Sequence, residues 1–308
     1  MAFPEFSVSP AGHVARMLIL DAAAVEVTDK LRDGRVESVL LKGPSVARWV
    51  YAEEEFRPYS DLDLLVAPGD LRRSLRVLSG LGFERVHSDA HAELLLRHHD
   101  QVTVDLHRLI VGVGVRPEEA WAALTAETEP LALRGGEVAM LSQAGRTLHV
   151  VLHAAQHGAG DAKPLQDLAQ ALERLPEEAW GDAARLALRL HAEAAFLTGL
   201  RLLPAGREVA GSTGVAEARS VEAALRAGTP PPTALGLYRF FQTPGAGPRA
   251  RLLAGELFPS AAFMRAWMPL ARRGPGGLAA AYVWRPVWLL LRLAPALLAW
   301  QRARRAAR

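Results

Sequence analysis

The strongest constraint in this sequence is the alternation of acidic and apolar residues in two short segments, 60–66 and 102–107. Because side chains alternate across a β-strand, Asp61 and Asp63 lie on one face of the first segment, and Leu62, Leu64 and Val66 lie on the other. Asp105 alternates in the same way in the second segment. If the two strands are close in one sheet, three carboxylates converge, and they repel one another unless a hard cation neutralises them. Oxygen ligands suit Mg²⁺ or Mn²⁺, so the sequence predicts a divalent metal site.

Composition limits the class of protein. Half of the 308 residues are apolar and 22% are charged, which is typical of a folded globular chain. The sequence contains no cysteine, which excludes disulfides, zinc–thiolate sites and thiol nucleophiles. Residues 1–9 lack the cationic start and apolar run of a secretory signal, so we expect a cytoplasmic protein.

The basic residues are used in an unusual way. Lysine occurs only at Lys30, Lys42 and Lys163, although lysine and arginine together number 36. We interpret the excess of arginine as a compositional habit, because no basic stripe interleaved with aromatic residues accompanies it, and a nucleic-acid partner is not expected. A lysine is therefore unusual in this chain, and Lys42 lies directly before Gly43 at the end of an apolar segment. Its presence indicates that a compact positive charge is needed there.

The pattern of apolar residues divides the chain near residue 140. Before it, short apolar segments predict strands at 39–41, 61–66, 83–86, 92–97 and 102–109. After it, the pattern predicts helices at 143–157, 164–174, 177–203, 215–227, 234–241 and 259–272. We therefore predict an α+β fold in two domains, with a mixed sheet and flanking helices over 1–140 and an all-α domain over 141–308.

The apolar segment 278–300 has two interpretations. Arg285 and Arg292 interrupt it, and Pro286 and Pro295 are expected to break a helix through it, so a membrane-spanning helix is not expected. One interpretation is a helix that covers the core of the second domain. The other is a weak membrane-surface contact made by the tryptophans of the segment and the arginines of the tail.

The acidic residues, taken with the glycine before them, resemble a known superfamily. Gly43 after a strand, then Asp61 and Asp63 on the next strand and Asp105 on a later one, resemble the nucleotidyltransferases that include DNA polymerase beta. More narrowly, the sequence resembles a bacterial family of uncharacterised nucleotidyltransferases. The matching segments are 40–43, 57–66, 82–83 and 104–107, followed in the helical half by His149, His153, His157 and Asp167.

The resemblance implies a fold and a reaction. The fold is a polymerase-beta-like mixed sheet followed by a helical domain. The reaction moves a nucleoside monophosphate from a nucleoside triphosphate, with ATP favoured, to an acceptor hydroxyl or phosphate, and releases pyrophosphate. Relatives in the wider superfamily modify antibiotics, proteins, tRNA and small metabolites, and members of the narrower family are associated with peptide natural-product genes. The resemblance therefore implies an acceptor that is a small molecule, a peptide or a protein without choosing among them.

The resemblance also implies residue roles. Asp61, Asp63 and Asp105 would be catalytic and would hold two Mg²⁺ or Mn²⁺ ions that clamp the attacking and leaving oxygens. The residues assigned by resemblance to binding the nucleotide are Lys42, Gly43, Ser45, Arg57 and His107. The turn at Gly43 would let backbone N–H groups approach the triphosphate. Pro44, which has no N–H, departs from the superfamily pattern and puts the phosphate role of Ser45 in doubt.

Several of these residues have two interpretations. Arg57 either contacts phosphate or pairs with Asp61 or with the acids at 53–55. His107 shares a face with Asp105, so it either lines the pocket as a proton relay or is a packed or hydrogen-bonded histidine. Asp167 is either a surface acid or a contact in the cleft between the two domains.

The three histidines at 149, 153 and 157 form one stripe of a helix. The first and third are about 12 Å apart along the axis, so a shared zinc ion is not expected. The stripe is expected to face the cleft or to pack there. Two rival functions remain for the whole chain, a regulatory module that binds nucleotide without catalysis and an enzyme that adds nucleotides to tRNA ends.

Overall fold

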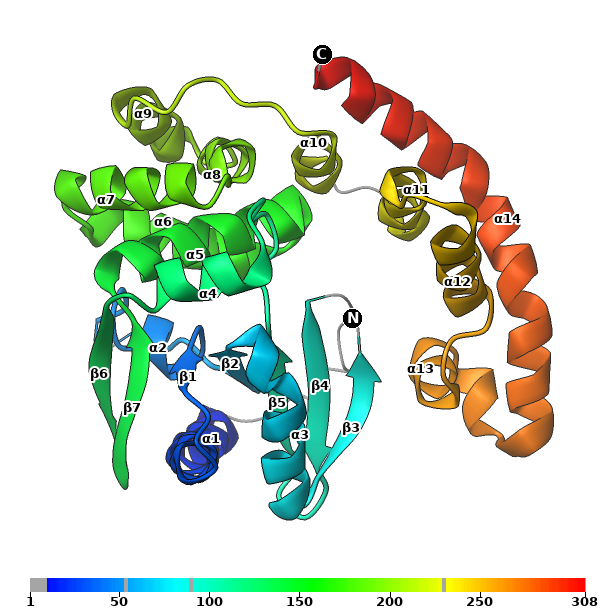
Figure 1. Ribbon diagram of the computed structural model, residues 1–308, viewed down its shortest axis with the longest axis horizontal. Helices are drawn as coiled ribbons and strands as arrows, with labels where there is room; N and C mark the ends of the chain where they lie inside the picture. The colour runs from blue at the N-terminus through cyan, green and yellow to red at the C-terminus, as the bar shows by residue number, and fades with distance from the viewer. Residues whose placement is uncertain (1–9, 53–54, 89–90, 229–230, 308) are drawn as a thin grey trace.

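The computed structural model describes residues 10–52, 55–88, 91–228 and 231–307. Figure 1 shows a sheet with helices on both faces and a long helical arm at one side. Residues 1–9, where no secretory signal is predicted, and the acids at 53 and 54 lie outside the described residues. Within those residues the sheet has seven strands in the order β3-β4-β5-β2-β1-β7-β6. The strands are β1 (Ser38–Leu40), β2 (Leu62–Val66), β3 (Phe83–Ser88), β4 (Ala92–Arg97), β5 (Val102–His107), β6 (Thr128–Leu133) and β7 (Gly136–Leu141).

The sheet is mixed, as predicted. β2 is antiparallel to β1 and parallel to β5, while β3, β4 and β5 form an antiparallel meander. All five strands predicted from the sequence are present, with ends that differ by at most three residues. The β6–β7 hairpin was not predicted, because β6 is an edge strand that starts with polar residues and contains Pro130. Gly135, with a φ of 104°, makes the tight turn between the two strands.

The two faces of the sheet pack against different helices. Leu62, Leu64 and Val104 point to the face that α1 and α3 cover, and they share one buried cluster with those helices. Val39 and Leu65 point to the opposite face and belong to the cluster built around α5. Because side chains alternate along each strand, the acidic residues of β2 and β5 also lie on the face that α5 covers.

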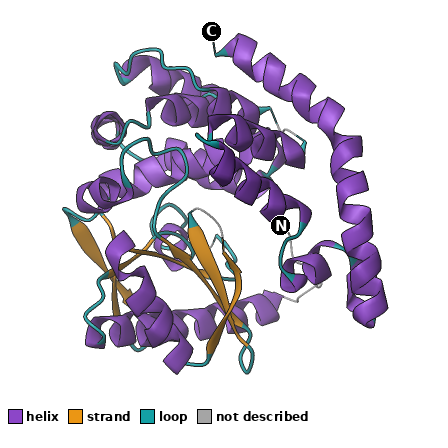
Figure 2. Ribbon diagram, turned by 45° about the vertical axis from the view of Figure 1, so that its right-hand side comes forward, coloured by secondary structure: helices purple, strands orange, loops and turns teal. Residues whose placement is uncertain are grey.

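The other regular elements of the described structure are helices, and the α-helices fall into three parts of the chain. The N-terminal part contains α1 (Pro10–Asp33), α2 (Pro44–Ala47), α3 (Leu71–Gly80) and α4 (Pro117–Leu124). A helical body follows, made of α5 (Gln143–His157), α6 (Ala162–Arg174), α7 (Glu177–Arg189), α8 (Glu193–Leu200) and α9 (Pro204–Ser212). The last part contains α10 (Val221–Ala227), α11 (Pro232–Gln242), α12 (Ala246–Leu257), α13 (Ala261–Trp267) and α14 (Gly274–Ala306). Figure 2 shows the strands gathered below the helical body, with α14 running apart from them.

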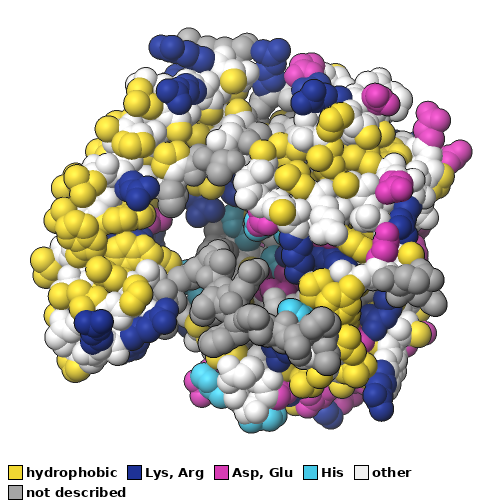
Figure 3. Space-filling view, turned by 180° about the vertical axis from the view of Figure 1, so that it is seen from behind, with side chains coloured by type: hydrophobic (Ala, Val, Ile, Leu, Met, Phe, Trp, Pro, Cys, Tyr) yellow, Lys and Arg dark blue, Asp and Glu magenta, His cyan; other side chains and the backbone are white. Residues whose placement is uncertain are grey.

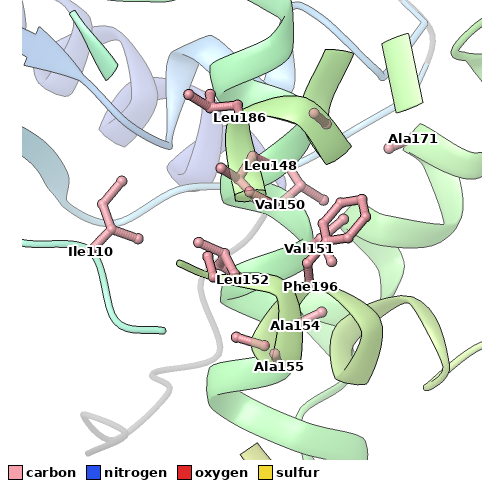
Figure 4. Packing of buried hydrophobic residues seen from close by; sticks show 14 of the residues in the cluster. Ile110, Leu148, Val150, Val151, Leu152, Ala154, Ala155, Ala171, Leu186 and Phe196 are labelled. Atoms are coloured by element: carbon pink, nitrogen blue, oxygen red, sulfur yellow. The ribbon is translucent and has the colours of Figure 1, made fainter. Parts of the chain in front are cut away.

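The helical body is organised around α5. Leu148, Val151 and Leu152 of α5 pack with Phe196 of α8 in one apolar cluster that continues to the sheet (Figure 4). Helix α5 begins and ends where the sequence predicts, with Ser142 as its N-cap. The single helix predicted over 177–203 is wrong, because the chain turns between α7 and α8, where His191 has a φ of 50°. No glycine or proline marks that turn in the sequence, so it carries no local signal.

The C-terminal arm, which we define as α11 to α14, differs most from the prediction. Helix α14 runs for 33 residues through both Pro286 and Pro295, which were expected to break it. It packs on small clusters that are separate from the core around α5, so the interpretation as a helix covering that core is wrong. By length and composition α14 is the one helix in the described part of the chain that could cross a membrane, and only 11% of its most apolar window is buried.

Candidate active site

Two carboxylates lie side by side on neighbouring strands near the centre of the sheet. In the parallel pairing of β2 with β5, Asp63 lies directly opposite Asp105. Asp61 comes one residue before β2 begins, on the same side of the strand as Asp63. The prediction that the two strands are neighbours in one sheet is therefore confirmed, and their pairing brings Asp63 and Asp105 together.

Positive charges surround Asp63, which is almost fully buried. The ammonium of Lys42, at the end of β1, lies 2.8 Å from Asp63 Oδ1. The Nε2 atom of His107 lies 3.2 Å from the same oxygen and 3.3 Å from Asp105 Oδ2. Although burial opposes ionisation, Lys42 and His107 hold the pKa of Asp63 well below its usual range. Burial lowers the pKa of His107, but its two carboxylate partners outweigh this effect and raise it to about 9.

Asp61 has a different electrostatic environment. Burial and the neighbouring charge of Asp63 raise the pKa of Asp61 to about 6, although Lys42 and Lys163 favour its ionised form. Lys163 lies in the first turn of α6, and its positive charge acts on Asp61 from the helical body. Sequence reasoning did not assign Lys163 to the site. The signal was its rarity, since two of the three lysines in the chain interact with these acids.

The donor atoms fit a divalent cation. Within the described residues, Asp63, Asp105 and His107 offer ligand atoms that all lie within 4.8 Å of one another. Two carboxylates and an imidazole are suitable ligands for a divalent ion, and Asp61 provides a further carboxylate beside them. His107 must first lose its proton, because a protonated imidazole has no free lone pair.

The turn at Gly43 lies beside the acids. Gly43 has a φ of 65°, and a Cβ there would lie 3.5 Å from the carbonyl oxygen of Asp61. Pro44 opens the short helix α2. Ser45 is fully buried, and its hydroxyl donates to the carbonyls of Leu41 and Lys42 at 3.1 and 3.3 Å. The hydroxyl of Ser45 therefore supports the turn from within.

Arg57 joins the turn to the helical body. Its guanidinium donates two hydrogen bonds of 2.6 Å to Asp167 of α6 and one of 3.4 Å to the carbonyl of Gly43. The hydroxyl of Tyr51 donates to Asp167 at 2.8 Å. Both Arg57 and Asp167 are buried, so the pair is an internal link between the two halves of the chain. Among the described residues Arg57 pairs with Asp167, and the predicted pairing with Asp61 or Glu55 is not found; the acids at 53 and 54 lie outside the described residues.

The histidine stripe of α5 lies against the end of β1. The Nδ1 atom of His149 is 3.3 Å from the carbonyl oxygen of Leu41, next to Lys42. Burial, and then the charge of Lys42, lower the pKa of His149 to about 3, so its ring is neutral at physiological pH. The rings of His153 and His157 meet edge to face, with 4.6 Å between their centres. The Nδ1 atom of His157 lies 2.9 Å from Oδ2 of Asp161. Among the described residues the group able to hold a metal consists of Asp63, Asp105 and His107 and does not include this stripe.

A glycine turn and a lysine lie beside paired carboxylates on one face of a mixed sheet, and this is the arrangement expected of proteins that act on phosphate-bearing substrates with a divalent cation. Residues 5–205, which make up more than half of the chain, match the model of a family described as uncharacterised nucleotidyltransferases, and the chain belongs to this family. It is a nucleotidyltransferase. No curated protein matches the chain.

The chain also has a weak similarity to solved structures, two of which follow. An antigenic nucleotidyltransferase-like protein from Paracoccidioides brasiliensis is 16% identical, with a TM-score of 0.36, covering 57% of this chain and 91% of that one. The antibiotic-resistance factor ANT(2'')-Ia is 13% identical, with a TM-score of 0.37, covering 56% of this chain and 91% of that one. The family assignment rests on the match of residues 5–205.

Proposed function

We propose that this chain transfers a nucleoside monophosphate from a nucleoside triphosphate, ATP in preference, to a hydroxyl or phosphate of an acceptor. The acceptor oxygen forms a bond to the α-phosphorus, the bond from this phosphorus to the α,β-bridging oxygen breaks, and pyrophosphate leaves while the acceptor gives up its proton. The observation that carries the proposal is the position of Asp63 directly opposite Asp105, with Asp61 beside them.

The acids would hold the metal, and the neighbouring cations would bind phosphate. Bound at Asp61, Asp63 and Asp105, Mg²⁺ or Mn²⁺ would neutralise the triphosphate and favour deprotonation of the acceptor. Lys42 and Lys163 supply positive charge on two sides of these acids, which suits a triphosphate that carries several negative charges.

The remaining assigned residues would act by shaping this site. Gly43 keeps the turn open at a φ that other residues rarely adopt, and Ser45 and Arg57 hold the same turn from inside. His107 donates to Asp105 while it is protonated, which fixes the direction of that carboxylate. We propose that these residues position the acids and the backbone around the nucleotide.

A cavity near the end of β5 suggests where part of the acceptor binds. It has a volume of about 220 Å³ and is lined by Ile110, Leu152, Gln156, His191 and Arg226, among others. Its lining residue Ile110 comes three residues after His107, and its lining residue Leu152 is the neighbour of His153 on α5. This volume is below the roughly 300–1,000 Å³ that encloses a drug-sized ligand, so it would hold one small group or side chain of a peptide or small molecule.

The two rival functions have less support. All three acids and Lys42 are present and close together, which favours catalysis over a module that only binds nucleotide. Addition of nucleotides to tRNA would need a surface for nucleic acid, and a steep fall of tRNA affinity with salt would reveal one.

Isothermal titration calorimetry tests the proposal directly. ATP, GTP, CTP and UTP are titrated in turn, with and without Mg²⁺, into the wild type and into Asp61→Asn/Asp63→Asn. We expect Mg²⁺-dependent binding of at least one triphosphate that the double variant loses by a factor of 100 or more. Asp182→Asn, an exposed acid on α7, is the matched control and should bind as the wild type does. Equal binding by the wild type and the double variant would contradict the proposed site.

A further inference from the structure

Charge is distributed very unevenly along this chain. All 33 acidic residues lie at or before Glu256, and none occurs in residues 257–308. The same C-terminal segment contains nine arginines and no lysine. The first 256 residues therefore carry a net negative charge and the last 52 a strong positive one. Most of the positive segment is helix α14 and the turn before it.

Helix α14 also exposes an apolar stripe. Val283 is 75% exposed, Leu290 is 69% exposed and Leu291 is 65% exposed. Val287 lies three and four residues before Leu290 and Leu291, and Leu298 lies eight and seven residues after them. These spacings correspond to one and two helical turns, so all these side chains lie on one side of the helix. Figure 3 shows hydrophobic side chains gathered along the arm, with lysine and arginine side chains among them. An exposed stripe of this kind marks a surface that another partner covers.

The opposite side of α14 is occupied by protein. Arg285 of α14 is buried inside the arm, where its guanidinium lies 4.7 Å from the ring centre of Trp267 and 5.4 Å from that of Trp288. It also donates to the carbonyl of Glu256 at 3.1 Å. A helix that crossed a bilayer alone would have to give up these contacts and bring Arg285 into hydrocarbon. With lipid on one side only, α14 fits the plane of a membrane surface.

We propose that the exposed side of α14 binds the surface of an anionic lipid bilayer, with the helix axis parallel to that surface. The apolar stripe would enter the boundary of the acyl chains. Arg302, Arg304 and Arg305 near the end of α14 would reach anionic headgroups, and Trp284, which is partly exposed, suits the headgroup level. The absence of acidic side chains from residues 257–308 is what favours an anionic lipid surface over a protein partner. This surface is separate from the acidic site, and the proposal does not depend on the reaction.

A chain without cysteine allows a clean test. Leu290→Cys on α14 and Leu188→Cys on α7, which is 47% exposed, are each labelled with the fluorophore NBD. The full-length proteins are mixed with vesicles of phosphatidylcholine alone or with one quarter phosphatidylglycerol. We expect the emission at position 290 to rise at least threefold and shift to the blue with the anionic vesicles only, and to fall back in 0.5 M NaCl. The label at position 188 should not respond.

Vesicle co-sedimentation of unlabelled protein gives the second measurement. Leu290→Gln/Leu291→Gln should bind anionic vesicles at least tenfold more weakly than the wild type, whereas Leu188→Gln should bind as the wild type does. Equal binding to neutral and anionic vesicles, or no binding to either, would overturn the proposal. A change at position 290 that depends on protein concentration without vesicles would assign the stripe to a second copy of this chain. Quenching of that label by lipids brominated at the bilayer centre, and not near the headgroups, would show a spanning helix and would also overturn it.

Discussion

Arg57, in the loop before β2, forms a buried two-fold hydrogen-bonded ion pair with Asp167 of α6, and both distances are 2.6 Å. The same guanidinium contacts the carbonyl of Gly43, at the turn beside the acidic site. The position of this turn is therefore tied to the helical body, 110 residues further along the chain.

Breaking the Arg57–Asp167 pair should destabilise the protein strongly. Arg57→Lys keeps the charge but cannot make both hydrogen bonds, and Asp167→Asn leaves the guanidinium without its counter-charge. Each change should lower the free energy of unfolding by about 3–5 kcal/mol, the usual cost of removing one partner of a buried pair. Urea denaturation of both variants and of the double variant measures the coupling. Strictly additive effects would show that the two side chains act independently.

Removing the charge of Asp63 should change the titration of His107. Because Asp63 and Asp105 raise the pKa of His107 to about 9, Asp63→Asn should lower that pKa towards the ordinary value of about 6.5. NMR titration of the histidine rings without divalent cations measures this change. The matched control is Asp161→Asn, which contacts His157 instead and should leave His107 unchanged. A pKa of His107 that does not move would contradict the contact with Asp63.

Lys163 should contribute to binding the triphosphate. Lys163→Gln removes one of the two lysine charges near the acids, and we expect about tenfold weaker binding, a loss of about 1.4 kcal/mol. Lys30→Gln is the control, because Lys30 is exposed on α1 and pairs with Asp33. Calorimetry with Mg²⁺ and the preferred triphosphate compares the two variants. Equal affinities would exclude Lys163 from the binding site.

The neutral ring of His149 should make the protein sensitive to acid. Its pKa is about 3 in the folded state and about 6.5 in the unfolded state, so below pH 6.5 the unfolded state binds a proton that the folded state does not. Stability is therefore lost as the pH falls. Between pH 7 and pH 5 the free energy of unfolding of the wild type should fall by about 2 kcal/mol more than that of His149→Gln, which has no titrating group at position 149. Urea denaturation at both pH values gives this difference, and parallel losses would contradict the buried neutral ring.

Gly199 should be essential to the contact between α5 and α8. A Cβ at this position would lie 2.2 Å from the carbonyl oxygen of Val151, so the helices must move apart in Gly199→Ala. We expect a loss of about 2–3 kcal/mol in the free energy of unfolding. Gly181→Ala on α7 is the control, because its Cβ would meet only the side chain of Arg185, and it should stabilise the protein by about 0.5–1 kcal/mol. Similar urea midpoints for the two variants would contradict the close approach.

Local patterns were sufficient for much of the fold. The strands of the meander and helix α5 were predicted because alternation and helical periodicity are strong in those segments. The turn at His191 and the edge strand β6 were not, because the first has no glycine or proline and the second contains a proline. Pro286 and Pro295 were expected to end a helix that continues, since α14 is held along its length by α10, α11 and α13.

By itself, the sequence determined that Asp61 and Asp63 share a face of one strand and that Asp105 and His107 share a face of another, because side chains in a strand must alternate. Only the tertiary structure decided that Asp63 stands opposite Asp105 and that Arg57 pairs with Asp167. It also decided that the charge of Lys163 acts on Asp61. These relationships depend on the order and register of the strands and on how α6 packs, which are set by contacts between residues 40 or more positions apart and have no local pattern.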